Sequence, residues 1–251
     1  MSQSTWKEAA RLIDISAVRS YHTEDDVREA VRIAKQYGFI NVHSLPCFTA
    51  LVSRLLADEP EIYTGAPVGF PGGGHTTETK LDEARRLIED GVDEMDVVMN
   101  IGMFRSGEDA YVLDELNQVI ALAHEARRSP DQPGPLGQPG QPGQPDSPGS
   151  PARIKTKVII EINALSDDEM LRACRLVMKT EADFIKTGTG WIAGGANIER
   201  IRKMMQETKG FIKVKAAGGI RTPDEFKRLR ELGVDRFGAN LKSALELVME
   251  R

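Results

Sequence analysis

Short apolar runs alternate with longer amphipathic stretches along most of the 251-residue chain. The short runs are rich in Val, Ile and Phe, as in strands that are buried in a sheet. Between them, apolar residues recur at the spacing of one helix face, as in "TEDDVREAVRIAKQYG" and "SDDEMLRACRLVMKT". Eight runs are predicted as strands, at 11–16, 40–45, 62–70, 94–100, 157–163, 183–188, 211–219 and 235–240.

Several of the helical stretches carry recognisable ends. They begin with Ser or Thr followed by acidic residues, and they end at Gly. In "TEDD" and "SDDE" a carboxylate follows the capping residue by about three positions, so we expect capping boxes at Thr23 and Ser166.

Eight strands that are each followed by a helix are typical of a (β/α)8 TIM barrel, here a single α/β domain covering 1–251. An open, doubly wound sheet is the alternative. We favour the barrel because of the strand number and because no dinucleotide-binding fingerprint follows the first strand. In such a barrel, chemistry takes place where the strands end and the helices begin.

The segment 129–153 differs from the rest of the chain. It contains three successive Gly-Gln-Pro triplets and almost no apolar residue, which predicts a flexible surface insertion. A proline-rich docking segment is the alternative. The segment lies between the fourth helix and the fifth strand, so we expect it on the face opposite the active site and expect its deletion to be tolerated.

Composition and charge restrict the partners. The chain is 40% hydrophobic and 28% charged with a net charge of −5, which argues against a nucleic-acid partner. No apolar run reaches the roughly 20 residues of a membrane span, and no signal-peptide pattern opens the chain, so we expect a soluble cytoplasmic protein. We expect Cys47 and Cys174 to be buried free thiols. No metal-ligand pattern is present, so we expect no metal.

Lysines at the ends of two apolar strands are the strongest chemical signal. Lys186 and Lys215 fall on neighbouring strands of the predicted barrel, whose interior is normally apolar. Burial and a second ammonium lower the pKa of a lysine, and a neutral amine attacks carbonyl carbon to form a Schiff base. Asp96 is placed to move protons. In the alternative interpretation, both lysines pair with Asp96 and Glu161 in a structural ion network.

Glycine-rich loops follow the sixth, seventh and eighth predicted strands, in "TGTGW", "AAGGIRTPDEF" and "RFGANLKSAL". Of these, the loops after the seventh and eighth strands, with a helix N-terminus, commonly hold phosphate in TIM barrels, and Arg221 could add a charged contact. Two histidines are interpreted as structural: His43 as a satisfied core histidine, and His75 as a loop or helix-start residue, with a place at the mouth of the site as the alternative for His75.

The motifs "VGFPGGGHTTETK", "EMDVVMNIG", "DFIKTGTGW" and "VKAAGGIRTPDEF" occur in this order and together resemble the deoxyribose-phosphate aldolases. The resemblance covers nearly all of the chain outside the insertion. It implies a class I aldolase on a TIM barrel that cleaves 2-deoxyribose 5-phosphate reversibly to acetaldehyde and glyceraldehyde 3-phosphate. It implies no metal or organic cofactor, and a homodimer or another homo-oligomer.

The resemblance also implies roles for individual residues. Lys186 forms the Schiff base, Lys215 perturbs its pKa and assists proton transfer, Asp96 belongs to the proton relay, and Asp14 matches an early aspartate of the site. The substrate- and phosphate-binding residues are then Thr187, Thr189, Gly190, Gly218, Gly219, Arg221, Gly238 and Asn240.

The chain departs from the family pattern at a few positions. His43 stands where a cysteine is common, Gly188 replaces a serine, and Asn240-Leu241 replaces a serine pair in the last strand's loop. These departures leave open a related Schiff-base aldolase with a different aldehyde or ketone substrate. A non-catalytic sugar-phosphate-binding barrel is a further alternative, against which the lysine pair argues.

Overall fold

The structure is a computed structural model, and it describes residues 3–126, 153–220 and 222–249. Residues 129–152 of the predicted insertion and the predicted phosphate contact Arg221 lie outside the described residues.

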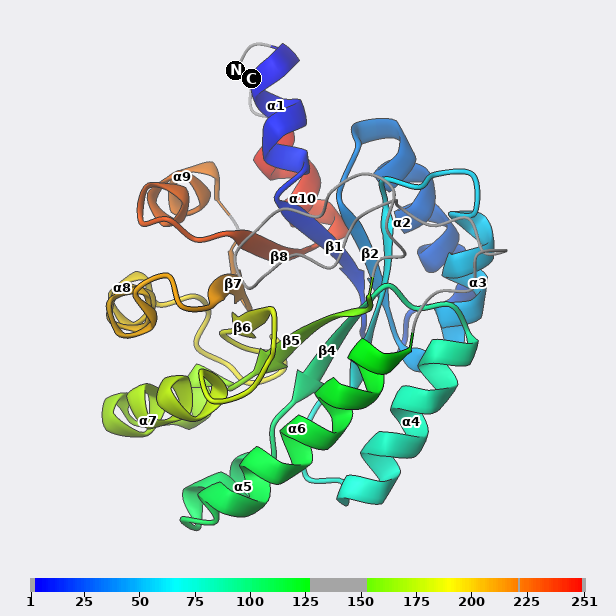
Figure 1. Ribbon diagram of the computed structural model, residues 1–251. Helices are drawn as coiled ribbons and strands as arrows, with labels where there is room; N and C mark the ends of the chain where they lie inside the picture. The colour runs from blue at the N-terminus through cyan, green and yellow to red at the C-terminus, as the bar shows by residue number, and fades with distance from the viewer. Residues whose placement is uncertain (1–2, 127–152, 221, 250–251) are drawn as a thin grey trace.

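Eight parallel strands form a closed barrel in which sequential strands pair and β8 returns to β1 (Figure 1). The predicted TIM barrel is confirmed, and the open doubly wound sheet is wrong. Each strand overlaps its predicted run. The strands are β1 (Ile13–Ala17), β2 (Asn41–Ser44), β3 (Tyr63–Val68), β4 (Glu94–Val98), β5 (Lys155–Ile159), β6 (Phe184–Lys186), β7 (Lys213–Ala217) and β8 (Arg236–Asn240).

Helices surround the barrel, and α1 and α10 lie side by side (Figure 1). Their apolar faces and the outward side chains of the strands form one buried core. The α-helices are α1 (Gln3–Ala10), α2 (Glu24–Tyr37), α3 (Thr49–Leu55), α4 (Thr77–Glu89), α5 (Ile101–Arg105), α6 (Asp109–Glu125), α7 (Asp167–Val177), α8 (Ile198–Thr208), α9 (Pro223–Glu231) and α10 (Leu241–Val248). Two short 3-10 turns are η1 (Pro46–Phe48) and η2 (Ile162–Ala164). Within the described ranges, no helix is long and apolar enough to cross a membrane.

The predicted capping boxes are confirmed. The Thr23 side chain accepts a hydrogen bond from Asp26 N at the start of α2, and the Ser166 side chain accepts one from Glu169 N at the start of α7. In each case the carboxylate accepts from the capping residue's own N–H, so both helices begin where the local sequence directs them to begin.

The two cysteines lie in different environments. Cys174 is buried in α7, as expected, and burial raises the pKa of its thiol to about 12. Cys47 is exposed, so its predicted burial is wrong. The reason is that β2 ends at Ser44, and Cys47 already lies in η1, where no residue is buried.

The flanks of the insertion lie where strands begin. The preceding helix, α6, ends at Glu125, and β5 begins at Lys155. Arg153 donates a hydrogen bond to Asp183 over 2.6 Å, just before β6. The anchoring residues therefore lie at the end of the barrel where chemistry is not expected.

The barrel interior is charged rather than apolar. Side chains alternate along each strand, so one set faces the helices and the other faces the centre. Besides His43, the central set contains seven ionisable residues, each at most 7% exposed. We call it the barrel charge cluster: Asp14, Glu94, Asp96, Lys157, Lys186, Lys215 and Arg236.

Candidate active site

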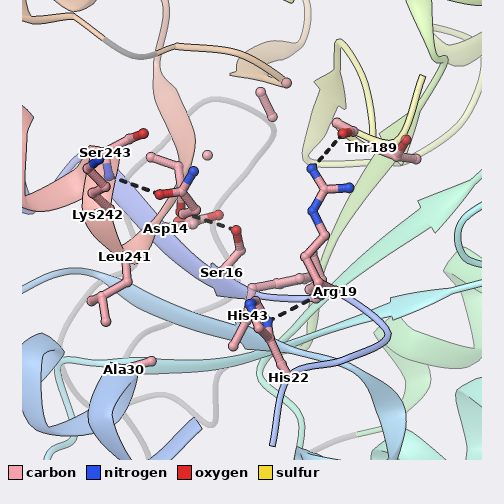
Figure 2. Close-up of a pocket in the computed structure, with 18 of the residues that line it drawn as sticks. Asp14, Ser16, Arg19, His22, Ala30, His43, Thr189, Leu241, Lys242 and Ser243 are labelled. Carbon is pink, nitrogen blue, oxygen red and sulfur yellow. Dashed lines mark hydrogen bonds between the residues drawn. The ribbon is translucent and has the colours of Figure 1, made fainter. Parts of the chain in front are cut away.

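A cavity of about 480 Å³ lies at the end of the barrel where the strands finish (Figure 2). It is bounded by the ends of β1, β6, β7 and β8 and by the loop between β1 and α2. The predicted site residues that line it are Asp14, Lys186, Thr189, Gly190, Lys215, Gly218, Gly219, Gly238 and Asn240.

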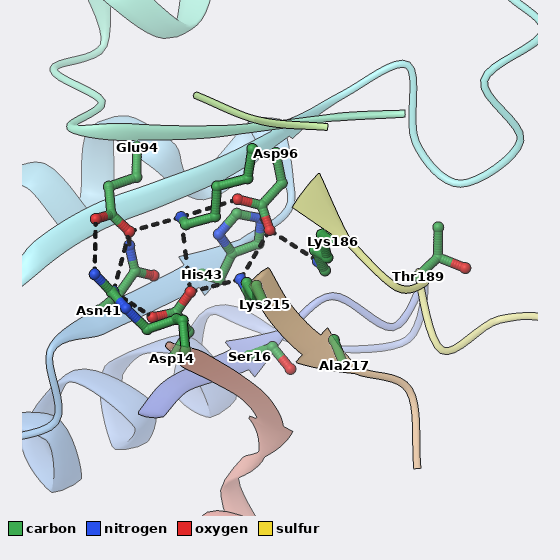
Figure 3. Close-up of polar contacts among 12 residues, drawn as sticks. Asp14, Ser16, Asn41, His43, Glu94, Asp96, Lys186, Thr189, Lys215 and Ala217 are labelled. Carbon is green, nitrogen blue, oxygen red and sulfur yellow. Dashed lines mark hydrogen bonds and ion pairs between the residues drawn. The ribbon is translucent and has the colours of Figure 1, made fainter. Parts of the chain in front are cut away.

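Lys186 and Lys215 are register partners on β6 and β7, as the predicted strand order requires. Both donate hydrogen bonds to the same oxygen, Asp96 Oδ2, over 2.8 Å from Lys186 Nζ and 2.9 Å from Lys215 Nζ (Figure 3). One fully buried carboxylate therefore holds both amines at the floor of the cavity.

The cluster continues beneath these three residues. Asp14 accepts hydrogen bonds from Lys215 and, over 2.8 Å, from Arg236. Lys157 donates to Glu94 over 2.6 Å and to Asp96 over 3.0 Å. Both carboxylates that accept from Lys215 therefore have further basic partners, which fix their positions.

Lys157, Glu94 and Arg236 were not identified as site residues from the sequence. Lys157 directly precedes the apolar residues of β5, and Arg236 directly precedes Phe237 in β8. A charge next to apolar strand residues is the signal that identified Lys186. Glu94 precedes Asp96 by two residues and so faces the same side of β4. The period of two along each strand could have added all three.

Charge balance within the cluster disfavours one ammonium. Its basic residues are Lys157, Lys186, Lys215 and Arg236, and its carboxylates are Asp14, Glu94 and Asp96. With every group ionised, the cluster carries one positive charge in excess. An excess charge away from water is unfavourable, so one basic group is expected to give up its proton.

Lys186 is the basic group of the cluster whose pKa is lowered, so that it loses its proton more easily. Burial is the main cause that lowers the pKa of Lys186 to about 8, and the charges on Lys215 and Lys157 add to it while Asp96 opposes it. The pKa of Lys157 moves the other way: burial opposes the ammonium, but Asp96 and Glu94 raise the value.

The carboxylates remain ionised. Burial opposes ionisation of Asp96, but Lys157, Lys186 and Lys215 hold its pKa well below the ordinary value. Burial also opposes ionisation of Asp14, and Lys215 and Arg236 lower its pKa. Asp14 and Asp96 are thus acceptors of hydrogen bonds in the resting site.

Glu161 does not join the cluster, so that part of the structural ion-network interpretation is wrong. Its Oε2 instead accepts a hydrogen bond from Thr189 N over 3.0 Å and another from the Thr189 hydroxyl. A β-carbon at Gly188 would come within 2.6 Å of Glu161 Oε1. The glycine at 188 therefore makes room for the carboxylate that holds the loop after β6.

Glycines form the far wall of the cavity. Gly190, Gly218 and Gly219 all have positive φ angles, of 76°, 89° and 104°. A β-carbon at Gly218 would lie 3.5 Å from Gly190 Cα, and one at Gly238 would lie 2.9 Å from Ala217 Cβ. The absence of side chains lets the loops after β6, β7 and β8 approach one another and leaves backbone around the cavity.

Two predicted binding residues have structural partners. Thr187 is fully buried, and its hydroxyl donates to Ala217 O over 2.8 Å and accepts from Ala217 N over 2.9 Å, which joins the loops after β6 and β7. Asn240 caps α10, its side chain accepting from Ser243 N over 2.9 Å. The first turn of α10, with Lys242, thereby lies at the cavity.

The rim of the cavity holds a cation that the sequence did not suggest. Arg19, in the loop after β1, donates a hydrogen bond to Gly190 O over 2.9 Å and stacks 5.5 Å from the centre of the Trp191 ring. Trp191 also makes an edge-on contact with Phe70, at 5.8 Å between ring centres. Loop residues without periodicity give no such signal in the sequence.

The two histidines interpreted as structural differ. His75 is exposed in the loop before α4 and does not line the cavity. His43 is 4% exposed and lines the cavity (Figure 2). Its predicted hydrogen-bond satisfaction is wrong: within the described residues, neither ring nitrogen has a partner. In the same described ranges, no group of His, Cys, Asp and Glu could hold a metal ion.

Three known proteins that this chain resembles in sequence or in structure carry the same name. The deoxyribose-phosphate aldolase of Klebsiella pneumoniae subsp. pneumoniae is 38% identical over 243 residues, covering 96% of this chain and 86% of the relative. That of Sinorhizobium medicae is 39% identical over 244 residues, covering 97% and 87%. The tetrameric deoxyribose phosphate aldolase structure from Aeropyrum pernix superposes with a TM-score of 0.79 at 26% identity, covering 98% of this chain and 92% of that one. No protein-family model matches the chain.

Proposed function

Because the chain belongs to the deoxyribose-phosphate aldolase family, we propose that it cleaves 2-deoxy-D-ribose 5-phosphate reversibly to acetaldehyde and D-glyceraldehyde 3-phosphate. The observation that carries this proposal is the environment of the Lys186 amine. This amine lines the cavity, has a pKa lowered to about 8, and shares one carboxylate oxygen with a second lysine.

Lys186 acts as the nucleophile. The lone pair of its neutral amine attacks C1 of the open-chain sugar, and uptake of one proton with loss of water leaves a positively charged Schiff base. Asp96 supports this step in two ways: it fixes the position of Nζ, and it stabilises the positive charge that forms there.

Carbon–carbon cleavage then uses the Schiff base as an electron sink. The hydroxyl on C3 loses its proton as the C2–C3 bond breaks. The electron pair of that bond enters the enamine, and C3 leaves as the carbonyl carbon of glyceraldehyde 3-phosphate. Protonation of the enamine at C2 and addition of water release acetaldehyde from Lys186.

Lys215 is the residue best placed to carry protons in these steps. It lines the cavity, and its Nζ contacts Asp96 and Asp14, which hold it in place. In this assignment Asp96 links the two lysines, while Asp14 positions Lys215.

The substrate phosphate is assigned to the glycine wall. Gly190, Gly218, Gly219 and Gly238 leave backbone accessible there, and α10 directs its N-terminus toward the cavity. Lys242, Arg19 and the predicted contact Arg221 supply positive charge. Thr189 and Asn240 support the loops that form this wall, and Thr187 joins two of them.

The proposal is tested by incubating the protein with 2-deoxyribose 5-phosphate and measuring both products. We expect acetaldehyde and glyceraldehyde 3-phosphate in equal amounts from the unaltered protein and none from Lys186→Met. A panel of other aldehydes and ketones tests the alternative of a related Schiff-base aldolase. Reaction of another donor–acceptor pair without cleavage of deoxyribose 5-phosphate would contradict the proposed substrate.

We also propose a homo-oligomer, first of all a homodimer. The tetrameric relative from Aeropyrum pernix supports self-association in general. Sedimentation equilibrium measures the assembly directly. A cytoplasmic location is likewise part of the proposal, and the free thiols of Cys47 and Cys174 suit a reducing compartment.

A further inference from the structure

His43 is a buried polar side chain whose surroundings do not satisfy it. The residue lies on β2, is 4% exposed, and lines the same cavity as Lys186 and Lys215. Among the described residues, neither Nδ1 nor Nε2 has a hydrogen-bond partner. Buried polar atoms nearly always have one, so this ring is arranged for a group that enters the cavity.

The barrel makes specific room for this imidazole. On the neighbouring strand, Gly65 is paired in register with His43, and a β-carbon there would collide with His43 Nδ1. A β-carbon would also come within 2.5 Å of Asn41 Oδ1. A residue with a side chain at 65 would displace the imidazole ring, so the position of His43 depends on glycine at 65.

The ring is close to the reacting amines. His43 Nε2 lies 3.8 Å from Asp96 Oδ2, which is too far for a hydrogen bond. The same oxygen accepts from Lys186 Nζ and Lys215 Nζ, so all three side chains surround one atom (Figure 3). A substrate attached to Lys186 Nζ therefore forms on the side of the cavity that the imidazole lines.

The ring is neutral in the resting site. Burial is the main cause that lowers the pKa of His43 to about 3, with Lys215 and Lys186 adding to it and Asp96 opposing it. A neutral imidazole carries one N–H donor and one acceptor nitrogen. Neutral imidazole serves as the hydrogen-bond donor to a substrate carbonyl in another barrel enzyme.

We propose that His43 is a substrate-binding residue whose imidazole donates a hydrogen bond to the oxygen on C3 of the sugar. This inference rests on the aldolase function proposed above. That oxygen is a hydroxyl in deoxyribose 5-phosphate and the carbonyl oxygen of the aldehyde that leaves, so a donor there orients the scissile bond and polarises the acceptor in the reverse direction. Acetaldehyde bound to Lys186 has no such oxygen, which separates the role of His43 from that of the lysines.

The test compares two reactions of the same variants. We expect His43→Ala to lower kcat/KM for cleavage of deoxyribose 5-phosphate by about 10²- to 10³-fold, the range typical for loss of one hydrogen-bond donor to a reacting oxygen. We expect the rate at which acetaldehyde adds to Lys186, measured by borohydride trapping, to stay within about twofold of that of the unaltered protein. Acetaldehyde has no C3 oxygen, so it does not form the hydrogen bond that the substitution removes. His43→Asn, which retains an N–H donor, should recover part of the loss. His75→Ala, at an exposed histidine, is the matched control and should change neither reaction.

Stability distinguishes a structural role. An unpaired buried polar ring stabilises little, so we expect the melting temperatures of His43→Ala and His43→Asn to stay close to that of the unaltered protein. Cleavage by both variants within twofold of the unaltered protein would overturn the inference. So would a parallel loss of acetaldehyde addition, because His43 would then act through the lysines. If the unaltered protein itself does not cleave deoxyribose 5-phosphate, the proposed function is wrong, and the inference about His43 is then wrong as well.

Discussion

Two buried lysines in this protein are surrounded in opposite ways. Lys80, on α4 outside the barrel, is fully buried, with one carboxylate partner, Glu115 on α6, at 2.5 Å and a hydrogen bond to Val98 O over 2.8 Å. Lys186, inside the barrel, shares Asp96 with Lys157 and Lys215 and faces a cavity.

Burial is the main cause that lowers the pKa of both lysines, and in both cases a carboxylate opposes the shift. Burial alone therefore does not make a reactive amine. Lys80 has a carboxylate of its own, and its side chain has no solvent exposure. Lys186 competes with other cations for its carboxylate and meets a cavity, so it can lose a proton and be reached by a carbonyl.

The largest expected effect comes from removing the reactive amine. Lys186→Met should lower kcat for cleavage by about 10⁴-fold or more, because the other amine on the cavity floor, Lys215, is held by two carboxylates, Asp14 and Asp96. The fold should be retained, since the change removes the excess positive charge from the barrel charge cluster. Product formation measures the loss of activity, and the circular dichroism spectrum shows whether the fold is retained. A variant that still cleaves would assign the chemistry to another residue.

Removing the second lysine should have the next largest effect. Lys215→Leu should lower kcat/KM by about 10²- to 10⁴-fold, the usual contribution of a positioned proton carrier. The loss of a nearby positive charge should also raise the pKa of Lys186 and move the pH profile upward. Rates measured from pH 6 to pH 10 test both points, and activity within tenfold of the unaltered protein would contradict them.

The Lys80–Glu115 pair should matter for stability instead. Lys80→Met should lower the free energy of unfolding by about 3–5 kcal/mol, because Glu115 is left buried without its partner. The double variant Lys80→Met/Glu115→Leu should recover most of that loss. Denaturant unfolding measures the stability, and kcat of the folded variants should stay within a few fold of the unaltered value. A large loss of kcat in the double variant would remove the distinction between the two lysines.

The pH dependence of the unaltered enzyme is a milder test. The pKa of Lys186 is lowered to about 8, so the fraction of Lys186 in the reactive neutral form increases as the pH rises. Above pH 9 nearly all of Lys186 is neutral. We expect kcat/KM to rise by about tenfold per pH unit below pH 8 and then to level off. The same shift makes a destabilising contribution below pH 8 that is relieved between pH 8 and the unfolded value of 10.5. A flat profile from pH 6 to pH 9 would contradict the lowered pKa.

Deletion of residues 129–152 should have the smallest effect. Both flanks, Glu125 and Arg153, lie at the end of the barrel away from the cavity. We therefore expect kcat/KM within about twofold of the full chain. A loss greater than tenfold would indicate that this segment takes part in the site.

The fold followed from local patterns. Each strand is a short apolar run and each helix has one apolar face, so the alternation can be read residue by residue. Lys186 and Lys215 stood out for the same reason, as charges where apolar side chains are expected. Thr187 shows the limit, because its motif does not say whether the hydroxyl faces a ligand or the backbone of Ala217.

The remaining site features depend on packing between distant segments. Arg19 reaches the cavity from a loop and meets Trp191, which is far away in the sequence. The unpaired ring of His43 depends on Gly65 in the next strand. Such contacts carry no periodic signal, so only the assembled barrel places these residues in the site.

The distinction between the two buried lysines can be measured in one sample. The unaltered protein is incubated with acetaldehyde, reduced with borohydride and digested, and the peptides carrying Lys186 and Lys80 are weighed by mass spectrometry. We expect an ethyl adduct on Lys186 and an unmodified Lys80. An unmodified Lys186 under conditions in which the protein remains folded would contradict its role as the Schiff-base lysine.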